Sequence, residues 1–453
     1  MIVSLHDCTP PPWTHRIRRL QHQDPPPSSC QIPSASLTKQ GERFLFSLAV
    51  TRDPKSTSRL ISKFVSSSTQ HMSLNTLSHL LSPHTTHPHL SSLALPLYSR
   101  ISKESWFQWN PKLVAELVAL LDKRGRHEEA EALIFETFSK LESRERELVL
   151  FYGNLMDAFC KHNSKRGFDD VFYRLSEFMS SSSSVYVKRQ AYKSIVSGLC
   201  EMGRPEEAEK LMEEMIVQGF EPSSFEFRSV VFGYGRLGFF EDMERCVDKM
   251  ESEEVVDTVC SNMVLSCYGD HNEVSRMVLW LKKMTGSGIP FSIRTYNSVL
   301  NSCSSIMSLL RDTNSDGFPV SIGGLKESLS GDDELVVVEE LVEESSVLDE
   351  ALEWGSGEAK LDLHGMHLGS AYLVMLQWME EMRCRFSDGK SPIPTEITVV
   401  CGSGKHSSVR GESPVKAMVK KMMIRTQSPL RIDRKNTGCF VAKGHVVRDW
   451  LSR

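Results

Sequence analysis

Two observations predict an α-solenoid of helix-pair repeats followed by a small α/β sandwich domain: an apolar stripe that returns about every thirty-five residues, and a strand–helix alternation after residue 357. The clearest copy of the stripe lies in residues 191–224. It follows the i, i+3, i+4, i+7 spacing of one buried helical face: Ala208, Leu211, Met212 and Met215. The next two copies fill the same slots: Met243, Cys246, Val247 and Met250, then Met277, Trp280, Leu281 and Met284. Helices repeated in this way bury their apolar faces by stacking on their neighbours.

Turn-forming residues divide the repeat into two helices. Gly203 and Pro205 separate the first helix from the second, because proline in a first helical turn removes an N–H that has no intrahelical partner. Gly219 and Pro222 then end the second helix. The alternative, an ordinary helical bundle, requires three successive copies to keep their register by chance.

Residues 192–222, YKSIVSGLCEMGRPEEAEKLMEEMIVQGFEP, and RTYNSVLNSC at 294–303 resemble pentatricopeptide repeats. The Trp-Leu-Gly-Tyr signature of the peptide-binding tetratricopeptide repeats is not found in the sequence. The expected units form an array over residues 111–311: 111–145, 149–188, 189–223, 224–257 and 258–292, with a partial unit from 293. The resemblance implies single-stranded RNA as a partner, and other organellar RNA-processing proteins as further partners.

The first hundred residues differ from the rest of the chain. They hold only four acidic residues and are rich in Ser, Thr, Pro and His, with scattered arginines. This composition is typical of an organelle transit peptide, so residues 1–100 are predicted to be a transit peptide and a disordered region. A disordered tail without a targeting role is the alternative. The abundance of serine, and the plastid location of the best-known proteins that resemble the whole architecture, favour the chloroplast over the mitochondrion.

Several kinds of site and segment are not expected. No apolar run is long enough for a membrane span. The 11 cysteines include no CxxC pair, which argues against a zinc ribbon or a disulfide framework and favours a reducing compartment. His84, His87 and His89 are predicted to lie in a solvated loop, because no Cys or acidic ligand is near them. No metal ligands are therefore predicted.

The net charge is −5, but acidic and basic residues are concentrated in different segments of the chain. Residues 327–358 hold 12 acids and no Lys or Arg, whereas residues 359–453 hold 16 Lys and Arg against 8 Asp and Glu. Residues 312–357 are predicted to be an acidic linker, whose VVVEELVEESSVLDEAL core forms one helix that completes a sixth repeat. The basic C-terminal block is the better guide to the partner, and it favours nucleic acid.

The C-terminal block, residues 358–453, reads as a βαβαββ sandwich. Its segments are KLDLHGMH, AYLVMLQWMEEM, TEITVVCGSGKHS, SPVKAMVKKMM and RIDRKNTGCFVAK, the last giving a hairpin. The block resembles the small MutS-related (SMR) domain, whose marks are an LDLHG strand end and a TGxG turn. Here Cys401 replaces the threonine, which keeps both glycines but removes a hydroxyl group.

Polar residues at the two strand ends suggest phosphodiester chemistry. Asp362 and His364 project to one face of a strand of period two, at the edge where ligands of α/β sheets usually lie. The N–H groups of Gly402 and Gly404 could cradle a phosphate. Cationic donors follow them: Lys405, His406 and Arg410. We expect His364 or His406 to transfer protons, Asp362 to orient a group or hold a divalent ion, and Lys405 with Arg410 to bind phosphate.

Cleavage and simple binding both remain open for this domain. The resemblance implies nicking or RNA endonuclease activity in some SMR domains and not in all. An Asp and a His at a strand end also often do no more than fix the turn through one hydrogen bond. No resident cofactor is predicted, and Mg²⁺ or Mn²⁺ is expected only if the domain cleaves.

In pentatricopeptide repeats, the fifth and last residues of a unit select the RNA base, and the resemblance carries these roles to three pairs here: Lys193 with Ser223, Arg228 with Asp257, and Asn262 with Ser292. Asn297 opens a further, incomplete unit. Only the third pair fits the family code, and it implies a pyrimidine. Lys193 and Arg228 are expected to contact phosphates, which gives affinity without base selectivity.

Two functions are consistent with the sequence. The first is an organellar RNA-binding protein of the pentatricopeptide–SMR type that acts in RNA processing, stabilisation or translation, with RNA endonuclease activity in the SMR domain. The alternative is a non-catalytic helical scaffold that binds protein partners, with a C-terminal domain that binds nucleic acid nonspecifically. Pyrimidine-selective binding favours the first function, and binding to peptides alone favours the second.

Overall fold

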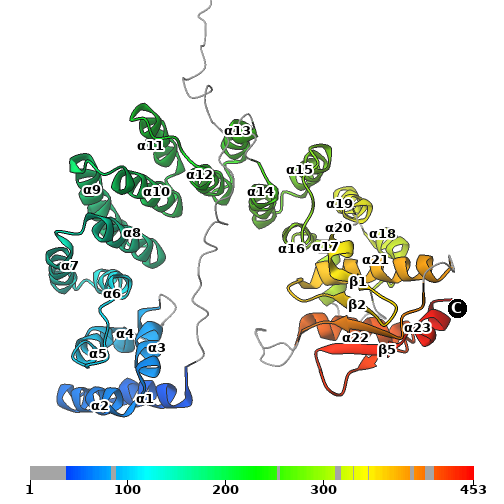
Figure 1. Ribbon diagram of the computed structural model, residues 1–453, viewed down its shortest axis with the longest axis horizontal. Coiled ribbons are helices and arrows are strands. Elements are labelled where there is room, and N and C mark those ends of the chain that lie inside the picture. Colours follow the sequence, from blue (N-terminus) through cyan, green and yellow to red (C-terminus); the bar gives the residue numbers. More distant parts are fainter. Residues whose placement is uncertain are drawn as a thin grey trace, which may run out of the picture. The chain divides into compact units, whose positions relative to one another are not determined.

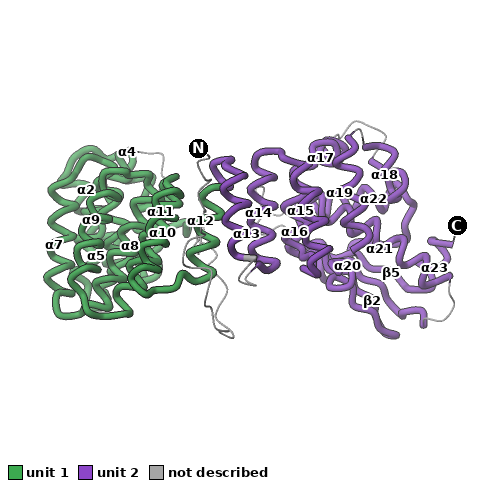
Figure 2. The backbone as a smooth tube through the Cα atoms, turned by 90° about the horizontal axis from the view of Figure 1, so that it is seen from above, with its two compact units in different colours: residues 1–234 green, residues 235–453 purple. Residues whose placement is uncertain are grey.

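The computed structural model of the chain describes residues 37–82, 88–251, 256–311, 318–329, 331–344, 346–387, 392–402 and 413–452. These residues form two compact units, one ending at Tyr234 and the other beginning at Gly235 (Figure 2). Helices account for most of both units, and a small sheet lies in the second (Figure 1). None of the described helices is long and apolar enough to cross a membrane.

Five helices precede the repeats, where the sequence predicted a disordered segment up to residue 100: α1 (Lys39–Val50), α2 (Pro54–Ser67), α3 (Gln70–Leu81), α4 (Pro88–Ser92) and α5 (Ala94–Ile101). The prediction is wrong from Lys39 onward. Thr38, Asp53 and Thr69 each accept a hydrogen bond from a backbone N–H in the first turn of the helix that follows. The Phe44 and Phe64 rings stack with centroids 3.8 Å apart, which joins α1 to α2.

The predicted solvated histidine loop is also different in the structure. His89 belongs to α4, and its Nε2 atom lies 3.2 Å from the Leu48 carbonyl oxygen and 3.1 Å from the Thr51 carbonyl oxygen. The imidazole therefore ties α4 to the end of α1. His84 and His87 lie outside the described residues.

Helix pairs follow in the first unit: α6 (Pro111–Lys123) with α7 (His127–Leu141), α8 (Glu145–His162) with α9 (Lys165–Ser181), and α10 (Val185–Glu201) with α11 (Pro205–Val217). The next first helix is α12 (Ser224–Arg236). Pro205 opens α11, and Gly203 and Gly219 take φ of +77° and +80° in the turns on either side of α11. The expected start of a unit at residue 189 is late by four residues, because Ser184 caps α10 and starts it at Val185.

The helical array continues in the second unit with α13 (Phe240–Glu251), α14 (Thr258–Asp270), α15 (Val274–Gly286), α16 (Ile293–Leu300) and α17 (Ser304–Arg311). The predicted stripe residues of α13 and α15 are buried: Met243, Cys246, Val247 and Met250, then Met277, Trp280, Leu281 and Met284. The stripe therefore marks the packed face of α13 and α15, as predicted from its spacing.

The acidic segment is folded rather than a linker. It forms α18 (Ile322–Ser328), α19 (Asp332–Glu343) and α20 (Ser346–Ala351), and α19 packs against α15. Glu334 is buried and accepts hydrogen bonds from the Ser304 hydroxyl group at 3.3 Å and the Ser305 N–H at 3.1 Å. The linker prediction is wrong for these residues. The single helix predicted in the VVVEELVEESSVLDEAL core is two helices in the structure, α19 and α20, and α19 extends the helical stack by packing on α15.

A five-stranded sheet ends the chain, in the spatial order β1-β2-β3-β5-β4. Its strands are β1 (Leu352–Trp354), β2 (Glu358–Asp362), β3 (Glu396–Val400), β4 (Arg431–Ile432) and β5 (Cys439–Lys443). Strands β2 and β3 are parallel, and the other pairs are antiparallel. The helices are α21 (Leu368–Ser387), α22 (Pro414–Arg425) and α23 (Gly444–Leu451), of which α23, like β1, was not predicted.

The two faces of the sheet differ. Ala359 and Leu361 of β2 are buried, whereas Glu358, Lys360 and Asp362 alternate with them and are exposed or half-buried. On the buried side, α21 packs against both α22 and α23, and Trp378 of α21 is fully buried. The strand end that carries Asp362 is therefore supported by a packed helical layer while its polar side chains remain accessible.

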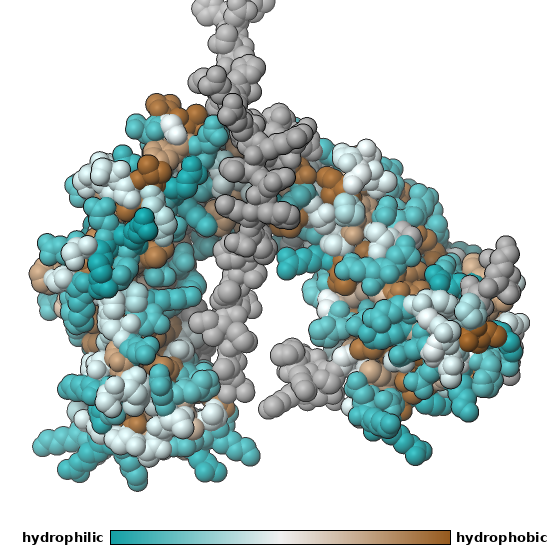
Figure 3. Space-filling view, viewed as in Figure 1, coloured by the Kyte–Doolittle hydropathy of each residue, from teal (hydrophilic) through white to brown (hydrophobic). Residues whose placement is uncertain are grey.

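Hydrophilic residues cover most of the surface seen in Figure 3, with scattered apolar patches. The exposed apolar side chains of the second helices include Phe135 on α7, Tyr173 on α9, Val217 on α11 and Leu279 on α15. Single exposed apolar side chains are normal on folded proteins and identify no site.

Candidate functional site

The carboxyl ends of β2 and β3 meet at one edge of the sheet. The two strands are parallel with Asp362 opposite Val400, and the Leu363 N–H donates to the Val400 carbonyl oxygen at 2.9 Å. A Cβ atom added to Gly402 would lie 3.8 Å from Cδ2 of His364. The fold therefore brings together three of the residues predicted from sequence: Asp362, His364 and Gly402.

Two glycines at this edge have a left-handed backbone conformation. Gly365 takes φ of +84° and Gly402 takes φ of +77°, both in the left-handed region that side chains disfavour. Asp362 Oδ1 accepts a hydrogen bond from the His364 N–H at 2.9 Å, which fixes the turn after β2. Asp362 is half-buried and His364 is exposed, so a ligand in solution can reach both side chains.

Cys401 precedes Gly402, at the position where the SMR motif that this block resembles has threonine. It is 5% exposed, and burial raises the pKa of its thiol to about 12. The thiol is therefore neutral at physiological pH and adds no charge beside the Gly402 turn. The Cys401 N–H donates to the Gly438 carbonyl oxygen at 2.8 Å, so the cysteine continues the pairing with the β5 side of the sheet.

The other predicted residues of this edge lie in residues 403–412, which the structure does not describe: Gly404, Lys405, His406 and Arg410. Within the described part of the chain, no group of three or more His, Cys, Asp or Glu side chains is arranged to hold a metal ion.

In the first unit, two cation–aromatic pairs join successive first helices. Lys193 Nζ of α10 lies 4.4 Å from the centroid of the Phe225 ring of α12. The Arg146 guanidinium of α8 lies 5.2 Å from the centroid of the Tyr186 ring of α10. Lys193 was predicted from the sequence as a phosphate-binding residue, but neither ring contact was predicted. An aromatic ring beside a cation can stack on a base while the cation pairs with a phosphate.

Two further residues of the first unit were predicted to contact RNA, Ser223 and Arg228. Ser223 donates from its N–H to Glu226 Oε2 at 2.8 Å and also bonds the same carboxylate through its hydroxyl group, which makes it part of the start of α12. Arg228 lies one turn further along α12 and is half-buried.

In the second unit, the pair that fits the family code is in direct contact. Asn262 Nδ2 donates to the Ser292 hydroxyl oxygen at 3.0 Å, and the Thr295 hydroxyl group donates to Asn262 Oδ1 at 2.7 Å. Asn262 is only 9% exposed. Asp257 is exposed and caps α14 by accepting from the Cys260 N–H at 2.9 Å.

Asn297, predicted to open an incomplete unit, contacts the strand-end loop instead of projecting freely. Its Nδ2 atom donates to the Gly365 carbonyl oxygen at 3.1 Å, and its Oδ1 atom accepts from the His367 N–H at 2.8 Å. The sequence pattern could not predict this contact, because it joins α16 to a loop about seventy residues later.

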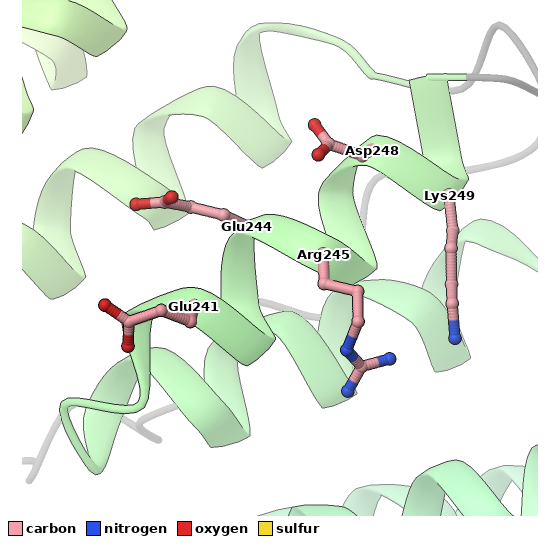
Figure 4. A pocket seen from close by; sticks show the side chains of 5 residues that line it. All are labelled: Glu241, Glu244, Arg245, Asp248 and Lys249. Carbon is pink, nitrogen blue, oxygen red and sulfur yellow. The ribbon is translucent and has the colours of Figure 1, made fainter.

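A surface pocket of about 520 Å³ lies on α13 and was not predicted (Figure 4). Arg245 and Lys249 extend side by side along its wall, and the acids Glu241, Glu244 and Asp248 complete the lining. Arg276 of α15 binds Glu241 at 2.9 Å and Glu244 at 2.6 Å, and Lys283 binds Asp248 at 3.4 Å. These ion pairs join consecutive second helices, so the acids of this pocket serve the stacking of the repeats.

Comparison with known proteins agrees with the helix-pair architecture. Residues 190–220, 227–255 and 259–289 match the family described as PPR repeat. The pentatricopeptide repeat-containing protein At2g17033 of Arabidopsis thaliana is 56% identical over 445 residues, covering 97% of this chain and 86% of the relative. The relative At3g53170 of the same plant is 25% identical over 198 residues, 43% of each chain.

Solved structures of the maize pentatricopeptide repeat protein PPR10 are also similar to the chain. The crystal structure without RNA has a TM-score of 0.36 and 14% identity, covering 85% of this chain and 59% of PPR10. The structure of PPR10 with an 18-nt psaJ RNA element has a TM-score of 0.31 and covers 79% of this chain and 59% of PPR10. By its repeats and its identity to a relative of nearly equal extent, the chain belongs to the pentatricopeptide repeat family.

Proposed function

We propose that the chain is an organellar protein that binds single-stranded RNA through its repeats and cleaves it at the strand end of an SMR-type C-terminal domain. The observation that carries the RNA-binding part is two cation–aromatic pairs that join successive first helices, Lys193 with Phe225 and Arg146 with Tyr186. Aromatic rings accept unpaired bases by stacking, and the cations beside them pair with the backbone. Single-stranded RNA offers both groups at once, whereas a peptide partner offers neither in regular alternation.

The base-selective step is assigned to Asn262 and Ser292. Their hydrogen bond holds the Asn262 amide in one orientation, and the Thr295 hydroxyl group fixes the amide from its other end. An oriented amide presents its remaining N–H donor in a fixed direction, which is the requirement for reading one base edge. Lys193 and Arg228 contribute affinity through phosphates instead.

Cleavage is assigned to the edge formed by Asp362, His364 and Gly402. In RNA cleavage the attacking hydroxyl group loses a proton and the leaving oxygen gains one, and the exposed imidazole of His364 is assigned to one of these two transfers. The Asp362 carboxylate would orient the attacking group or hold Mg²⁺ or Mn²⁺. The N–H groups after Gly402, with Lys405, His406 and Arg410, are assigned to the scissile phosphate and its developing charge. No step requires the Cys401 thiol, which burial keeps neutral.

A specific observation favours a second candidate, in which the C-terminal domain binds RNA without cleaving it. Asp362 accepts the His364 N–H, and this bond alone explains an aspartate at the end of a strand. Lys193 and the basic residues of the C-terminal domain would then serve only to hold RNA. Incubation of a labelled RNA with the wild-type protein separates the two candidates, because the first predicts cleavage that Asp362→Ala abolishes and the second predicts no cleavage by the wild type.

The cellular site is proposed to be the chloroplast, with the mitochondrion as the alternative. The acid-poor, serine-rich composition of the first hundred residues supports an organelle. Named relatives include the chloroplastic protein At5g48730 and the mitochondrial protein At2g13420, both from Arabidopsis thaliana. A fluorescent fusion of the full chain, imaged against markers of both organelles, distinguishes the two, and a cytosolic signal would contradict the proposal.

Base selectivity gives a direct test of the assigned repeat. Replacing Asn262 by Thr should shift the preference at one nucleotide from pyrimidine toward purine by about tenfold, the size expected for one changed base contact. The measurement is a filter-binding titration with RNA oligomers that differ at a single position. Arg228→Gln is the control, because loss of a phosphate contact should weaken binding to all oligomers equally. Unchanged selectivity in Asn262→Thr would show that Asn262 does not read a base.

A further inference from the structure

The loop between β2 and α21, residues 363–367, is held by the last first helix of the repeat array. The Asn297 amide spans the loop, donating to the Gly365 carbonyl oxygen at 3.1 Å and accepting from the His367 N–H at 2.8 Å. It therefore bonds the backbone on both sides of Met366, whose side chain is buried. The Asn297 amide therefore gives the loop backbone the two hydrogen bonds that a neighbouring strand would otherwise supply.

Two other contacts strengthen the attachment of α16 to residues 363–369. The Asn301 amide nitrogen, one turn after Asn297, lies within hydrogen-bonding distance of Nδ1 of His367. At Gly369, a Cβ atom would lie 3.1 Å from Leu300 Cβ and 3.3 Å from the Leu300 carbonyl oxygen, so the start of α21 sits directly against the end of α16. Helices α16 and α21 also pack together in the same compact unit (Figure 1).

The loop needs this external support because it carries an exposed reactive group. The His364 side chain is exposed, and its imidazole has no hydrogen-bond partner among the described residues. Its position therefore depends on the backbone, which Asp362 holds from one side at the His364 N–H and Asn297 holds from the other at Gly365. A displacement of about 1 Å at a reacting group can cost about a hundredfold in rate.

We infer that Asn297 is a positioning residue for the strand-end site, aided by Asn301, and that it does not read an RNA base. The Asn297 carbonyl oxygen and one of its N–H donors are bonded to the loop backbone on both sides of Met366, so reading a base with this amide would release the loop. The inference rests on the proposed function, since it assigns the positioned group to RNA cleavage. It also means that base reading by the described array stops at the Asn262–Ser292 pair.

The same helix joins the two activities. Thr295, which bonds the base-reading Asn262 at 2.7 Å, lies two residues before Asn297 on α16. Residues that orient the last read base and residues that hold the cleavage loop therefore share one short helix. This arrangement places a fixed spacer between the last selected base and the strand-end site, so cleavage should occur at a constant distance from that base.

The test compares Asn297→Ala with wild type in the full-length protein. At saturating RNA, the cleavage rate should fall by about 10- to 100-fold, while affinity and base selectivity stay within about twofold. A variant that merely unfolds a fraction of the protein would lower the fraction of RNA-binding protein in proportion to the rate. Ser298→Ala, on the same helix and without a hydrogen bond to the loop, should match wild type.

Hydrogen exchange supplies a readout that does not depend on activity. In Asn297→Ala, peptides that cover residues 363–371 should exchange faster, while peptides that cover β3 should be unchanged. Asn297→Asp keeps the acceptor for the His367 N–H and should give an intermediate result. Unchanged exchange, or altered selectivity at one nucleotide, would overturn the positioning role even if the wild type cleaves RNA. A wild type that does not cleave would instead refute the catalytic part of the proposed function, and exchange would still decide the role of Asn297.

Discussion

Alanine at Asp362 or at His364 should abolish cleavage of a labelled RNA while leaving its affinity within a few-fold of wild type. Proton transfer by a positioned side chain contributes about 10²- to 10⁴-fold to a rate, so either loss is large. Neither side chain is part of the buried core, since Asp362 is half-buried and His364 is exposed. The assay resolves the products on a denaturing gel with Mg²⁺ or Mn²⁺ present, beside a filter-binding titration.

Asp362→Asn separates the two roles that the structure allows for this aspartate. The asparagine amide oxygen can still accept the His364 N–H, so the turn after β2 is retained. If the carboxylate acts in chemistry, cleavage by Asp362→Asn should be as low as cleavage by Asp362→Ala. If Asp362 only fixes the turn, Asp362→Asn should keep full activity. Cleavage that survives in the Asp362→Ala, His364→Ala double variant would place the chemistry on other residues or on a contaminating nuclease.

Salt should weaken RNA binding steeply, because phosphate contacts release counterions. Each phosphate contact on a single strand contributes about −0.7 to the slope of log affinity against log salt. Replacing both Lys193 and Arg228 by Gln should therefore reduce the magnitude of the slope by about 1.4. Lys210→Gln is the matched control, because Lys210 is an exposed lysine of α11, a second helix, and should leave the slope unchanged.

The basic C-terminal surface is tested in the same titration by replacing Lys420 and Lys421, which are exposed on α22. Point variants are preferable to deleting the domain near Gly355, because β1 ends at Trp354 and pairs with β2. Such a deletion would leave a cut sheet edge and uncover the face of α16 that packs on α21. If neither set of variants changes the slope, phosphate contacts are absent from both surfaces and the RNA-binding proposal fails.

The sequence predicted the repeat helices well because each second helix repeats a stripe of period 3.6. It failed where one residue type has two uses. The abundance of Ser and Thr and the scarcity of acids in the first hundred residues predicted a transit peptide and disorder, yet Thr38 and Asp53 cap helices there. Likewise, residues 312–357 were predicted to be an acidic linker, although Glu334 in this segment is buried and paired. Strand β1 was missed because three residues are too few to show alternation.

The sequence predicted the part of the strand-end site that depends on local patterns. Strand period and glycine turns are local, so Asp362, His364 and Gly402 could be assigned to one edge before the sheet was known. The support of that edge is not local. Asn297 has the sequence position of a base-reading residue, and only the packing of α16 on α21 turns its amide toward Gly365. A contact across about seventy residues leaves no periodic signal in one sequence.

The most direct test is to expose the purified full-length protein to a random pool of single-stranded RNA and to sequence the retained molecules. The proposed function predicts that retained RNA carries a pyrimidine at one fixed position, that this enrichment disappears in Asn262→Thr, and that cleavage products end at a constant distance from that position. Retention without any base preference, or binding to peptides with no retention of RNA, would contradict sequence-selective RNA binding by these repeats.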